Sequence, residues 1–355
     1  MIFKGKTILV TGGTGSMGKT FVRRVLTGKL GTPKKIIVFS RDEAKQHEMR
    51  LSYMHRTVTT DEVIFRNFMN VLEFRIGDVR SYADVCSAVK SADIVINAAA
   101  LKQVPTCEYF PMQALLTNCT GASNIMRAIE ENGYPVKSVV GISTDKACKP
   151  VNVMGMTKSL QERIFISANI FIPKTRFICV RYGNVLASRG SVIPLFHDQI
   201  RIGGPVTITV PEMTRFLLSL DQAVDTVFAA LKGAKRGETY VPNAPSATVE
   251  NIARALIGER RIKTKITGIR PGEKMHEIMV SDEEANHCVK RGNYFAILPM
   301  LPELGLNNQH KHPALTKELS SADNVVDLKG TINLLKRHRL MLEDRDSAGW
   351  EELLR

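Results

Sequence analysis

Throughout its first half, the chain alternates between short apolar segments and longer segments with the spacing of helices. The apolar segments are rich in Ile, Val, Leu and Phe, and they lie at residues 6–11, 35–40, 72–76, 93–98, 137–143 and 176–181. Strands with this composition are typically covered on both faces of a sheet. Helix-like segments lie between them, at 19–27, 81–90, 114–131 and 154–169. The alternation predicts an α/β fold with a doubly wound parallel sheet.

A glycine-rich turn, TGGTGSMG, directly follows the first predicted strand. Its glycines allow the backbone to approach a pyrophosphate, and the next helix offers free N–H groups and the positive end of its dipole. At the first strand–helix junction of an alternating chain, this pattern indicates a dinucleotide-binding Rossmann domain. The residues of the turn that we expect to contact the dinucleotide are Gly12, Thr14, Gly15, Ser16, Met17 and Gly18.

The end of the second strand, FSRDEAK, indicates which dinucleotide is bound. An NAD site usually places an acid against the ribose 2′-hydroxyl, whereas Arg suits a 2′-phosphate because it can donate two hydrogen bonds. Here Ser40 and Arg41 come first and Lys45 follows one helical turn later, which favours NADP over NAD. Asp42 keeps NAD open as the alternative, although an Asp in this position also caps helices.

The next two strand ends offer contacts to the same ligand. Asp78 and Val79, in GDVR after the third strand, suit an adenine ring, because Asp78 can accept a hydrogen bond from its amino group. After the fourth strand, three small residues allow a ligand to lie against the backbone, and Lys102 follows them into the same cleft. The three small residues are Ala98, Ala99 and Ala100.

The stretch STDKACKPVNVMGMTKS, which begins at the end of the fifth strand, carries an acid and a base. Thr144 lies where cofactor and substrate meet in such sheets, and Asp145 and Lys146 follow it at once. Lys158 falls at the start of a helix, and Met154 occupies the position four residues earlier where a catalytic Tyr would be expected. A thioether cannot give or take a proton, so the proton chemistry must rest on other groups.

Further along the chain, three separate loops carry an Arg beside a glycine or a turn. They are RYGNVLASRGSVIP with Arg189, MTRF with Arg215, and GIRPGEK with Arg270. Arg binds phosphate oxygens with paired hydrogen bonds, so three such loops together suit a diphosphate.

After the sixth strand the rhythm changes, because Gly- and Pro-marked turns divide the chain into shorter elements. We expect the NADP-binding Rossmann domain to span 1–185, with 217–240 returning to it. A smaller α/β domain, mainly for the substrate, would span 186–300, and 301–355 would form a C-terminal extension. The long second connection, at 55–71, is either an insertion loop or an extra helix.

Composition limits the classes of function. Lys and Arg outnumber Asp and Glu by 49 to 35, and the resulting charge of +14 favours anionic ligands. The basic residues are spread along the chain, so phosphorylated small molecules fit better than nucleic acid. The six cysteines lie far apart without CxxC spacing, which predicts no metal site and a reducing, cytoplasmic compartment. No run of about 20 apolar residues is present, so we expect no membrane span.

Taken together, the motifs TGGTGSMG, FSRDEAKQ, GDVR, AAALKQVP, STDKA, RYGNV, SRGSVIPLF, MTRF and RPGEK resemble the extended short-chain dehydrogenase/reductase superfamily. More narrowly, about residues 4–300 are similar to the nucleotide-sugar 4,6-dehydratases, in particular the UDP-N-acetylglucosamine 4,6-dehydratases that invert C5. The segments ALKQVPTCEYFP and VMGMTKS resemble the capsule and O-antigen branch, in which Met stands in place of the catalytic Tyr, as Met154 does here.

The resemblance implies a reaction and a set of roles. The family oxidises the sugar C4 hydroxyl with tightly held NADP, removes the C5 proton, expels the C6 hydroxyl as water and reduces C6. Mapped onto this chain, Lys146 would be the C5 base, Asp145 the acid for the C6 oxygen, and Thr144 a partner of the C4 oxygen. A Lys base must be neutral for part of the time, so we expect desolvation and nearby positive charge to lower the pKa of Lys146. Lys158 would hold the nicotinamide ribose. Lys146, Lys158 or an ordered water would take the C4 hydroxyl proton in place of Tyr.

The resemblance also implies substrate contacts and an assembly. UDP-N-acetylglucosamine would be held with Arg side chains on its diphosphate and Glu273 on the uridine ribose, while Lys102 lines the sugar site. The expected substrate-binding residues are Lys102, Asn184, Arg189, Ser191, Arg215, Arg270 and Glu273. Such enzymes form dimers through two helices of the Rossmann domain and often build hexamers, so we expect a homo-oligomer.

Two other functions stay open at this point. A UDP-sugar 4-epimerase shares the fold but needs only hydride removal and return at C4, so the adjacent Asp145 and Lys146 argue against it. A non-catalytic, NADP-binding regulatory protein is the lesser alternative, and it is suggested by Met154 and by the net charge of +14.

Overall fold

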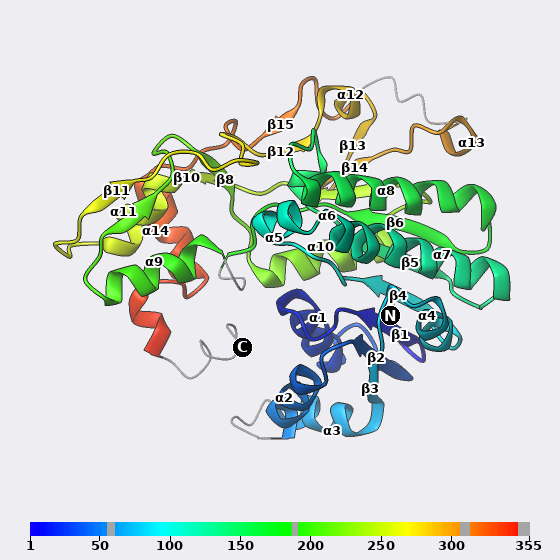
Figure 1. Ribbon diagram of the computed structural model, residues 1–355. Coiled ribbons are helices and arrows are strands. Elements are labelled where there is room, and N and C mark those ends of the chain that lie inside the picture. Colours follow the sequence, from blue (N-terminus) through cyan, green and yellow to red (C-terminus); the bar gives the residue numbers. More distant parts are fainter. Residues whose placement is uncertain (55–60, 187–190, 306–312, 347–355) are drawn as a thin grey trace.

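The computed structural model describes residues 1–54, 61–186, 191–305 and 313–346. A large sheet lies at the centre of these residues, and helices cover both of its faces (Figure 1). A smaller group of elements lies to one side of the sheet, and we call it the second lobe. It is formed by residues 192–216, 246–266 and 328–346.

The central sheet has nine strands in the order β13-β14-β9-β6-β5-β4-β1-β2-β3. All neighbours from β3 to β9 run parallel, whereas β14 and β13 are antiparallel to their neighbours. The strands are β1 (Thr7–Thr11), β2 (Lys35–Ser40), β3 (Leu72–Ile76), β4 (Ile94–Asn97), β5 (Ser138–Ile142), β6 (Arg176–Val180), β9 (Thr239–Pro242), β13 (Cys288–Arg291) and β14 (Tyr294–Ile297). The six predicted strands and the doubly wound α/β fold are therefore confirmed.

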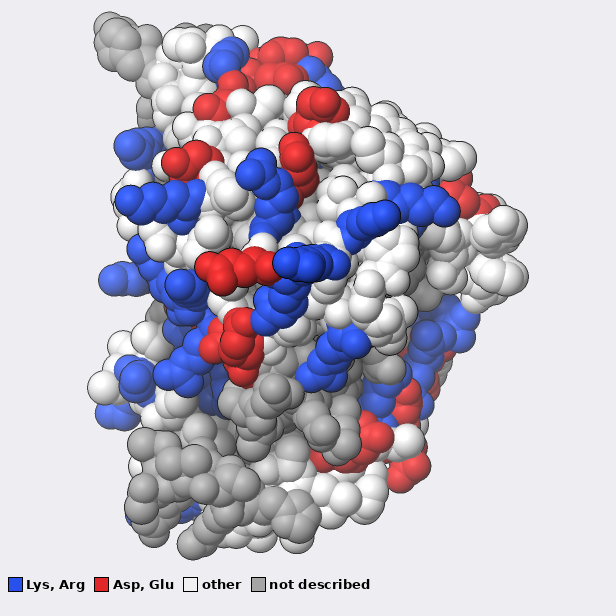
Figure 2. All heavy atoms as spheres, turned by 90° about the vertical axis from the view of Figure 1, so that its left-hand side faces the viewer, with Lys and Arg blue, Asp and Glu red and all other residues white. Residues whose placement is uncertain are grey.

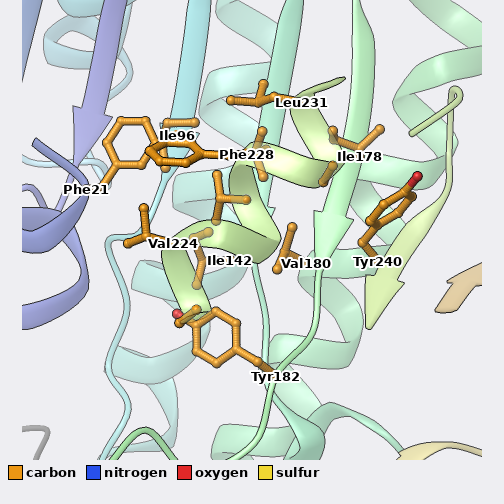
Figure 3. Close-up of a cluster of buried hydrophobic side chains, with 14 of the residues drawn as sticks. Phe21, Ile96, Ile142, Ile178, Val180, Tyr182, Val224, Phe228, Leu231 and Tyr240 are labelled. Carbon is orange, nitrogen blue, oxygen red and sulfur yellow. The ribbon is translucent and has the colours of Figure 1, made fainter. Parts of the chain in front are cut away.

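Helices pack on the two faces of the sheet because successive strand residues point to opposite sides. One face is covered by α1 (Ser16–Leu26), α2 (Glu43–Met54), α3 (Asp61–Val71) and α10 (Leu220–Gly233), and the other by α4 (Tyr82–Val89), α7 (Gly121–Asn132) and α8 (Val153–Phe171). Each face thus has its own hydrophobic core, which we call the first core, beneath α1, α2, α3 and α10, and the second core, beneath α4, α7 and α8. In β1, Val10 packs in the first core and Leu9 in the second. Figure 3 shows the first core, in which Phe21 of α1 and Phe228 of α10 lie over the sheet.

The long connection between the second and third strands contains an extra helix. Asn67 of α3 donates a hydrogen bond to the carbonyl of Leu26 at the end of α1, at 2.6 Å, and Phe68 is buried in the core beneath it. Residues 55–60 lie outside the described ranges. Of the two alternatives for 55–71, the structure therefore supports a helix from residue 61 onward.

The predicted helix at 114–131 is divided into three parts. It comprises α6 (Pro111–Leu115), a π-helical turn (Leu116–Thr120) and α7, and the short α5 (Val104–Tyr109) precedes it. Within the π turn, the Asn118 amide donates to the carbonyl of Leu101 and to Thr157 Oγ1, both at 3.0 Å. Asn118 thereby connects the segment after β4 to α8.

The second lobe has a core of its own, which includes Phe196, Leu256 and Leu335. Its elements are α9 (Val192–Arg201), β7 (Val206–Ile208), β8 (Thr214–Phe216), β10 (Ser246–Thr248), α11 (Val249–Ile257), β11 (Thr264–Ile266), α14 (Leu328–Arg337) and a 3₁₀ turn (Leu342–Asp346). The chain leaves this lobe twice to rejoin the sheet. It does so first as α10 and β9, and then as β13 and β14, which the sequence assigned to the second domain. The remaining elements are β12 (Ile278–Val280), which pairs with β15 (Leu319–Ser320), α12 (Asp282–Ala285) and α13 (Pro302–Gly305).

The surface carries charges of both signs. Figure 2 shows the face that includes the second lobe, where Lys and Arg side chains are scattered with Asp and Glu between them. In the described part of the chain, no helix combines the length and the apolar character needed to cross a membrane. Nor do three or more His, Cys, Asp or Glu side chains of that part come together as metal ligands.

Candidate active site

A cleft of about 610 Å³ opens at the carboxyl ends of the parallel strands, where such sheets bind their ligands. Every residue that the sequence predicted for the dinucleotide lines this cleft. These residues are Gly12, Thr14, Gly15, Ser16, Met17, Gly18, Ser40, Arg41, Lys45, Asp78, Val79, Ala98, Ala99, Ala100 and Lys158. The fold thus gathers five separate segments of the sequence around one cavity.

The glycine-rich turn is packed so closely that side chains would not fit. A Cβ on Gly12, whose φ is +64°, would lie 2.7 Å from the backbone nitrogen of Ala99. A Cβ on Gly18 would lie 2.6 Å from the Cα of Gly13, so α1 begins directly against the turn. Backbone N–H groups and the start of α1 therefore face the cleft, and this cradle fits a pyrophosphate.

The end of β2 presents basic side chains to the cleft, while its acid is already engaged. Asp42 accepts a hydrogen bond from the backbone nitrogen of Lys45 at 3.0 Å, as a helix cap does, and it pairs with Lys45 Nζ at 2.6 Å. Arg41 lies 3.7 Å from Asp78 across the cleft wall. Asp42 therefore acts as a cap for α2, which was one of its two predicted roles, and Arg41 stays on the cleft wall.

The predicted acid–base pair lies in a tight turn at the end of β5. Thr144 precedes the 3₁₀ turn Asp145–Ala147, and its Oγ1 donates to Asp145 Oδ1 at 2.9 Å. The Asp145 side chain is fully buried, whereas Thr144 and Lys146 line the cleft. The carboxyl group of Asp145 thus lies behind the two side chains that face a ligand.

The ammonium of Lys146 has three partners. Its Nζ lies 3.0 Å from Asp145 Oδ1, 3.1 Å from Asn184 Oδ1 and 3.0 Å from Glu277 Oε1. Glu277 comes from the segment just before β12, and its side chain is 3% exposed. An ammonium has three N–H donors, so these partners use all of its hydrogen-bonding capacity.

These contacts determine the charge of the cluster. Burial alone lowers the pKa of the Lys146 ammonium, but the carboxylates of Asp145 and Glu277 outweigh it and raise that pKa above its ordinary value. Burial raises the pKa of Asp145. Burial opposes ionisation of Glu277 as well, yet Lys146 and Arg215 hold its pKa below the ordinary value. The expected lowering of the Lys146 pKa is therefore wrong for this structure, because that expectation counted burial and positive neighbours but not the attraction of the Asp145 and Glu277 carboxylates.

Helix α8 brings Lys158 and Met154 to the cleft. Lys158 Nζ donates to the carbonyl of Ile142 and, at 2.7 Å, to Gln161 Oε1. Burial lowers the pKa of Lys158 to about 8. One turn earlier, Met154 lines the cleft and packs in a small apolar cluster with Cys107, so this position of the cleft wall offers a thioether and no proton carrier.

The N-terminus of α8 lies directly against the acid–base turn. A Cβ on Gly155 would lie 2.2 Å from the carbonyl oxygen of Lys146, so only glycine permits this approach. Asn152 caps the helix through the backbone nitrogen of Gly155 at 2.8 Å, and its amide donates to the carbonyl of Gly272. The helix therefore holds the turn on one side and the GIRPGEK loop on the other.

The predicted substrate residues are distributed unevenly. Lys102, Asn184 and Ser191 line the cleft. Arg215 is buried, and its Nε lies 3.8 Å from Glu277 Oε1. Glu273 accepts from the backbone nitrogen of Arg270, which is exposed, and neither is on the cleft wall. Arg189 lies outside the described residues.

Two further residues of the site escaped the sequence analysis. Glu277 follows the RPGEK motif by three positions, and Tyr182 lies within the RYGNV motif. Tyr182 lines the cleft among the described residues. Burial raises the pKa of its phenol, so the phenol keeps its proton and cannot readily accept another. The Arg and Asn residues of these motifs were assigned roles from the sequence, whereas Tyr182 and Glu277 were assigned none. The signal for Glu277 was an additional acid beside a binding loop.

Relatives of this chain have been described as two kinds of enzyme. A Rickettsia bellii protein named UDP-glucose 4-epimerase is 44% identical over 301 residues, which cover 83% of this chain and 84% of the relative. A Campylobacter jejuni protein named UDP-N-acetylglucosamine 4,6-dehydratase (inverting) is 43% identical over 303 residues, covering 84% of this chain and 85% of the relative.

Solved structures agree with the fold. The X-ray structure of Pen from Bacillus thuringiensis is 34% identical with a TM-score of 0.84, and the match covers 96% of this chain and 100% of that one. DesIV, a dTDP-glucose 4,6-dehydratase from Streptomyces venezuelae with NAD bound, is 18% identical with a TM-score of 0.64 over 98% and 99% of the two chains, which shows a shared fold. A family model described as polysaccharide biosynthesis protein matches residues 8–299. The chain therefore belongs to this family, within the extended short-chain dehydrogenases/reductases.

Proposed function

We propose that the protein is a UDP-N-acetylglucosamine 4,6-dehydratase that inverts C5. Its product would be a UDP-2-acetamido-2,6-dideoxy-hexos-4-ulose for capsule, O-antigen or other glycan biosynthesis in the cytoplasm. The observation that carries this proposal is the contact between Asp145 and Lys146 at the cleft, because an acid and a base side by side suit an elimination. The inverting relative from Campylobacter jejuni supports it.

The cofactor in this proposal is NADP. The glycine turn would hold the pyrophosphate, and Ser40, Arg41 and Lys45 would hold the 2′-phosphate. Val79 and Asp78 would contact the adenine, and the alanines after β4 and Lys158 would contact the nicotinamide end. The bound cofactor would supply hydride acceptance at C4 and hydride return at C6. Because Asp42 is already engaged as a helix cap, NADP suits the end of β2 better than NAD.

The acid–base turn would carry out the elimination. With a ketone at C4, the C5 proton is acidic, and neutral Lys146 Nζ would take it. The C6–oxygen bond then breaks, and the oxygen leaves as water with a proton that comes from Asp145. Thr144 faces the cleft, where it would contact the C4 oxygen, and its hydrogen bond to Asp145 Oδ1 would link the buried carboxyl to the substrate. A proton from solvent, added to C5 from the opposite face, would give the inverted sugar.

Among the groups that could take the C4 hydroxyl proton in place of Tyr, we favour Lys158. It lines the cleft one helical turn after Met154, and its pKa of about 8 leaves part of it neutral near that pH. Lys146 suits this step less well, because its two carboxylate partners favour the charged form.

A UDP-sugar 4-epimerase is the second candidate, and the 44% identical Rickettsia bellii relative favours it. Such an enzyme would change C4 without losing water. The two functions therefore differ in the mass of the product.

Incubation with UDP-N-acetylglucosamine and NADP in D₂O tests the proposal, with mass spectrometry and NMR of the product. The expected result is loss of one water, deuterium at C5 and ring coupling constants of the inverted sugar. An unchanged mass with a new C4 configuration would refute dehydration and support the epimerase. Lys146→Ala should abolish water loss, and undiminished turnover by that variant would refute the role of Lys146.

We also propose that the protein forms a homodimer through two helices of the Rossmann domain, with a hexamer as the larger alternative. Apolar side chains are exposed on the outer face formed by α6 and α8, which pack against each other. They are Met112, Leu115, Met156 and Leu160. Exposed apolar side chains on two helices that pack together favour contact with a second copy.

A further inference from the structure

We propose that Glu277 is a positioning residue for Lys146, and that it holds the base of the elimination from a distant part of the chain. This inference rests on the proposed function for the role of Lys146. The contact itself rests on the geometry, in which Glu277 Oε1 lies 3.0 Å from Lys146 Nζ. Glu277 does not line the cleft, so it would act on the substrate only through Lys146.

The backbone of Glu277 is fixed at two points. Its nitrogen donates to Ser321 Oγ at 2.9 Å, and its carbonyl accepts from the backbone nitrogen of Ser321 at 2.8 Å. Ser321 Oγ in turn lies 2.7 Å from Thr214 Oγ1 on β8. Three segments that are far apart in sequence therefore place one carboxylate beside the base.

Other charged and titratable groups around Lys146 come from its own turn, from β8 and from the segment before β12. Asp145 contacts Nζ from the turn, and Arg215 on β8 lies 3.8 Å from Glu277. Before β12, Lys274 donates to the carbonyl of Cys148, and His276 Nδ1 lies 2.8 Å from Thr214 Oγ1. Among the described residues, Glu277 is thus the acidic side chain that contacts Lys146 from outside the turn that carries Lys146.

The three partners of Nζ differ in their ability to accept its proton. Asn184 cannot be protonated, Arg215 helps to keep Glu277 ionised, and burial favours the acid form of Asp145. Transfer of one proton from Nζ to Asp145 Oδ1, along their 3.0 Å contact, would leave a neutral amine and a carboxylic acid. These are the base and the acid that the elimination needs. Glu277 would remain ionised and would stabilise the ammonium again when Nζ takes the C5 proton.

Competitive acetylation of the full-length protein tests the contact without any substrate. Acetic anhydride reacts with neutral lysine, and the Lys146 side chain is 21% exposed, so the pH midpoint of its labelling can be measured by peptide mass spectrometry. Glu277→Gln removes the negative charge and should move this midpoint down by about one pH unit or more. Glu277→Asp keeps the charge and should leave the midpoint within about half a unit. Glu238→Gln, which alters another buried glutamate paired with Arg291, should leave it unchanged.

Turnover of UDP-N-acetylglucosamine by the same variants tests the consequence. At pH values above the Lys146 pKa, where the amine is neutral in both proteins, a weaker base removes a proton more slowly, so Glu277→Gln should lower the plateau of kcat about threefold or more with little change in KM. The lowered pKa leaves more of the amine neutral at lower pH, so the ascending limb of the pH profile should move to lower pH. Glu277→Asp should recover part of the rate. An unmoved labelling midpoint in Glu277→Gln overturns the inference whatever the substrate. A moved midpoint in a protein that does not dehydrate UDP-N-acetylglucosamine supports the inference and overturns the proposed function.

Discussion

The pKa values of two lysines of the cleft shift in opposite directions because their partners differ. Lys158 donates to a backbone carbonyl and an amide oxygen rather than to a carboxylate, so burial outweighs the more distant negative groups and lowers its pKa to about 8. Lys146 lies between two carboxylates, and their attraction outweighs burial. The difference provides one lysine that is partly neutral near pH 8 and another that must pass a proton to a neighbour before it can act as a base.

The lowered pKa of Lys158 predicts a pH-dependent stability. Between pH 8 and 10.5, the unfolded chain binds a proton at this residue that the native chain has released, so the free energy of unfolding rises with pH in this window. Relative to Lys158→Met, the wild type should gain up to about 3 kcal/mol across it. Urea unfolding at several pH values measures this difference. A constant difference between the two proteins would contradict the lowered pKa.

Arg41 predicts the choice of cofactor. The ionic hydrogen bonds of a guanidinium to a 2′-phosphate contribute about 1.5–3 kcal/mol, so Arg41→Ala should weaken NADP binding by at least about tenfold. NAD lacks that phosphate, and its affinity should stay nearly the same, which makes it the internal control. Fluorescence titration with both dinucleotides measures the two affinities. Equal losses for NADP and NAD would show that Arg41 does not contact the phosphate.

At the scale of elements, the junction between α8 and the acid–base turn is the most crowded contact of the site. Gly155→Ala would insert a methyl group 2.2 Å from the carbonyl oxygen of Lys146. The turn or the helix must then move, with a loss of about 1–3 kcal/mol in the free energy of unfolding and a loss of dehydratase activity. Chemical denaturation and product analysis measure both. Ser159→Ala, on the same helix, is the matched control, and an equally mild effect of the two substitutions would refute the crowding.

Much of the architecture was predictable because it depends on local patterns. Strands covered on both faces have continuous apolar sequences, and β1 to β6 lie within about one residue of the predicted segments. The dinucleotide cradle was predictable as well, since strand ends in such a sheet meet at one edge. The π turn around Asn118 was not, because a helix pattern with one extra residue looks like an unbroken helix.

The partner of Lys146 was unpredictable for a different reason. Glu277 reaches it only after the segment before β12 has been tied to Ser321 and β8, and each of those contacts joins residues that are distant in sequence. The Glu277 carboxylate adds to the attraction of Asp145, and together they raise the Lys146 pKa that the sequence had predicted to fall. Residue type indicated which groups could do chemistry, whereas tertiary packing determined their charge.

At the scale of the whole molecule, the apolar face of α6 and α8 predicts an assembly. Leu160 is 49% exposed on this face, and a charged residue there would be buried without a partner in a dimer. Leu160→Glu should therefore shift the protein from dimer to monomer, which light scattering coupled to size-exclusion chromatography measures. Met69→Glu is the control, because Met69 is 62% exposed on α3, away from this face. A monomeric wild type at micromolar concentration would contradict the proposal.

The order of strands in the sheet has a consequence for synthesis on the ribosome. β6 pairs with β9, and β9 pairs with β14, yet the second lobe separates these strands along the chain. At roughly 5–20 residues per second, the hundred or so residues between β6 and β14 take about 5–20 s to translate. During that time the nascent Rossmann half carries an open, apolar strand edge of the kind that chaperones recognise and that pairs with other chains. The last strands of the central sheet to be translated close that edge, so a truncated transcript that stops before residue 297 should yield an aggregation-prone fragment rather than a smaller working domain.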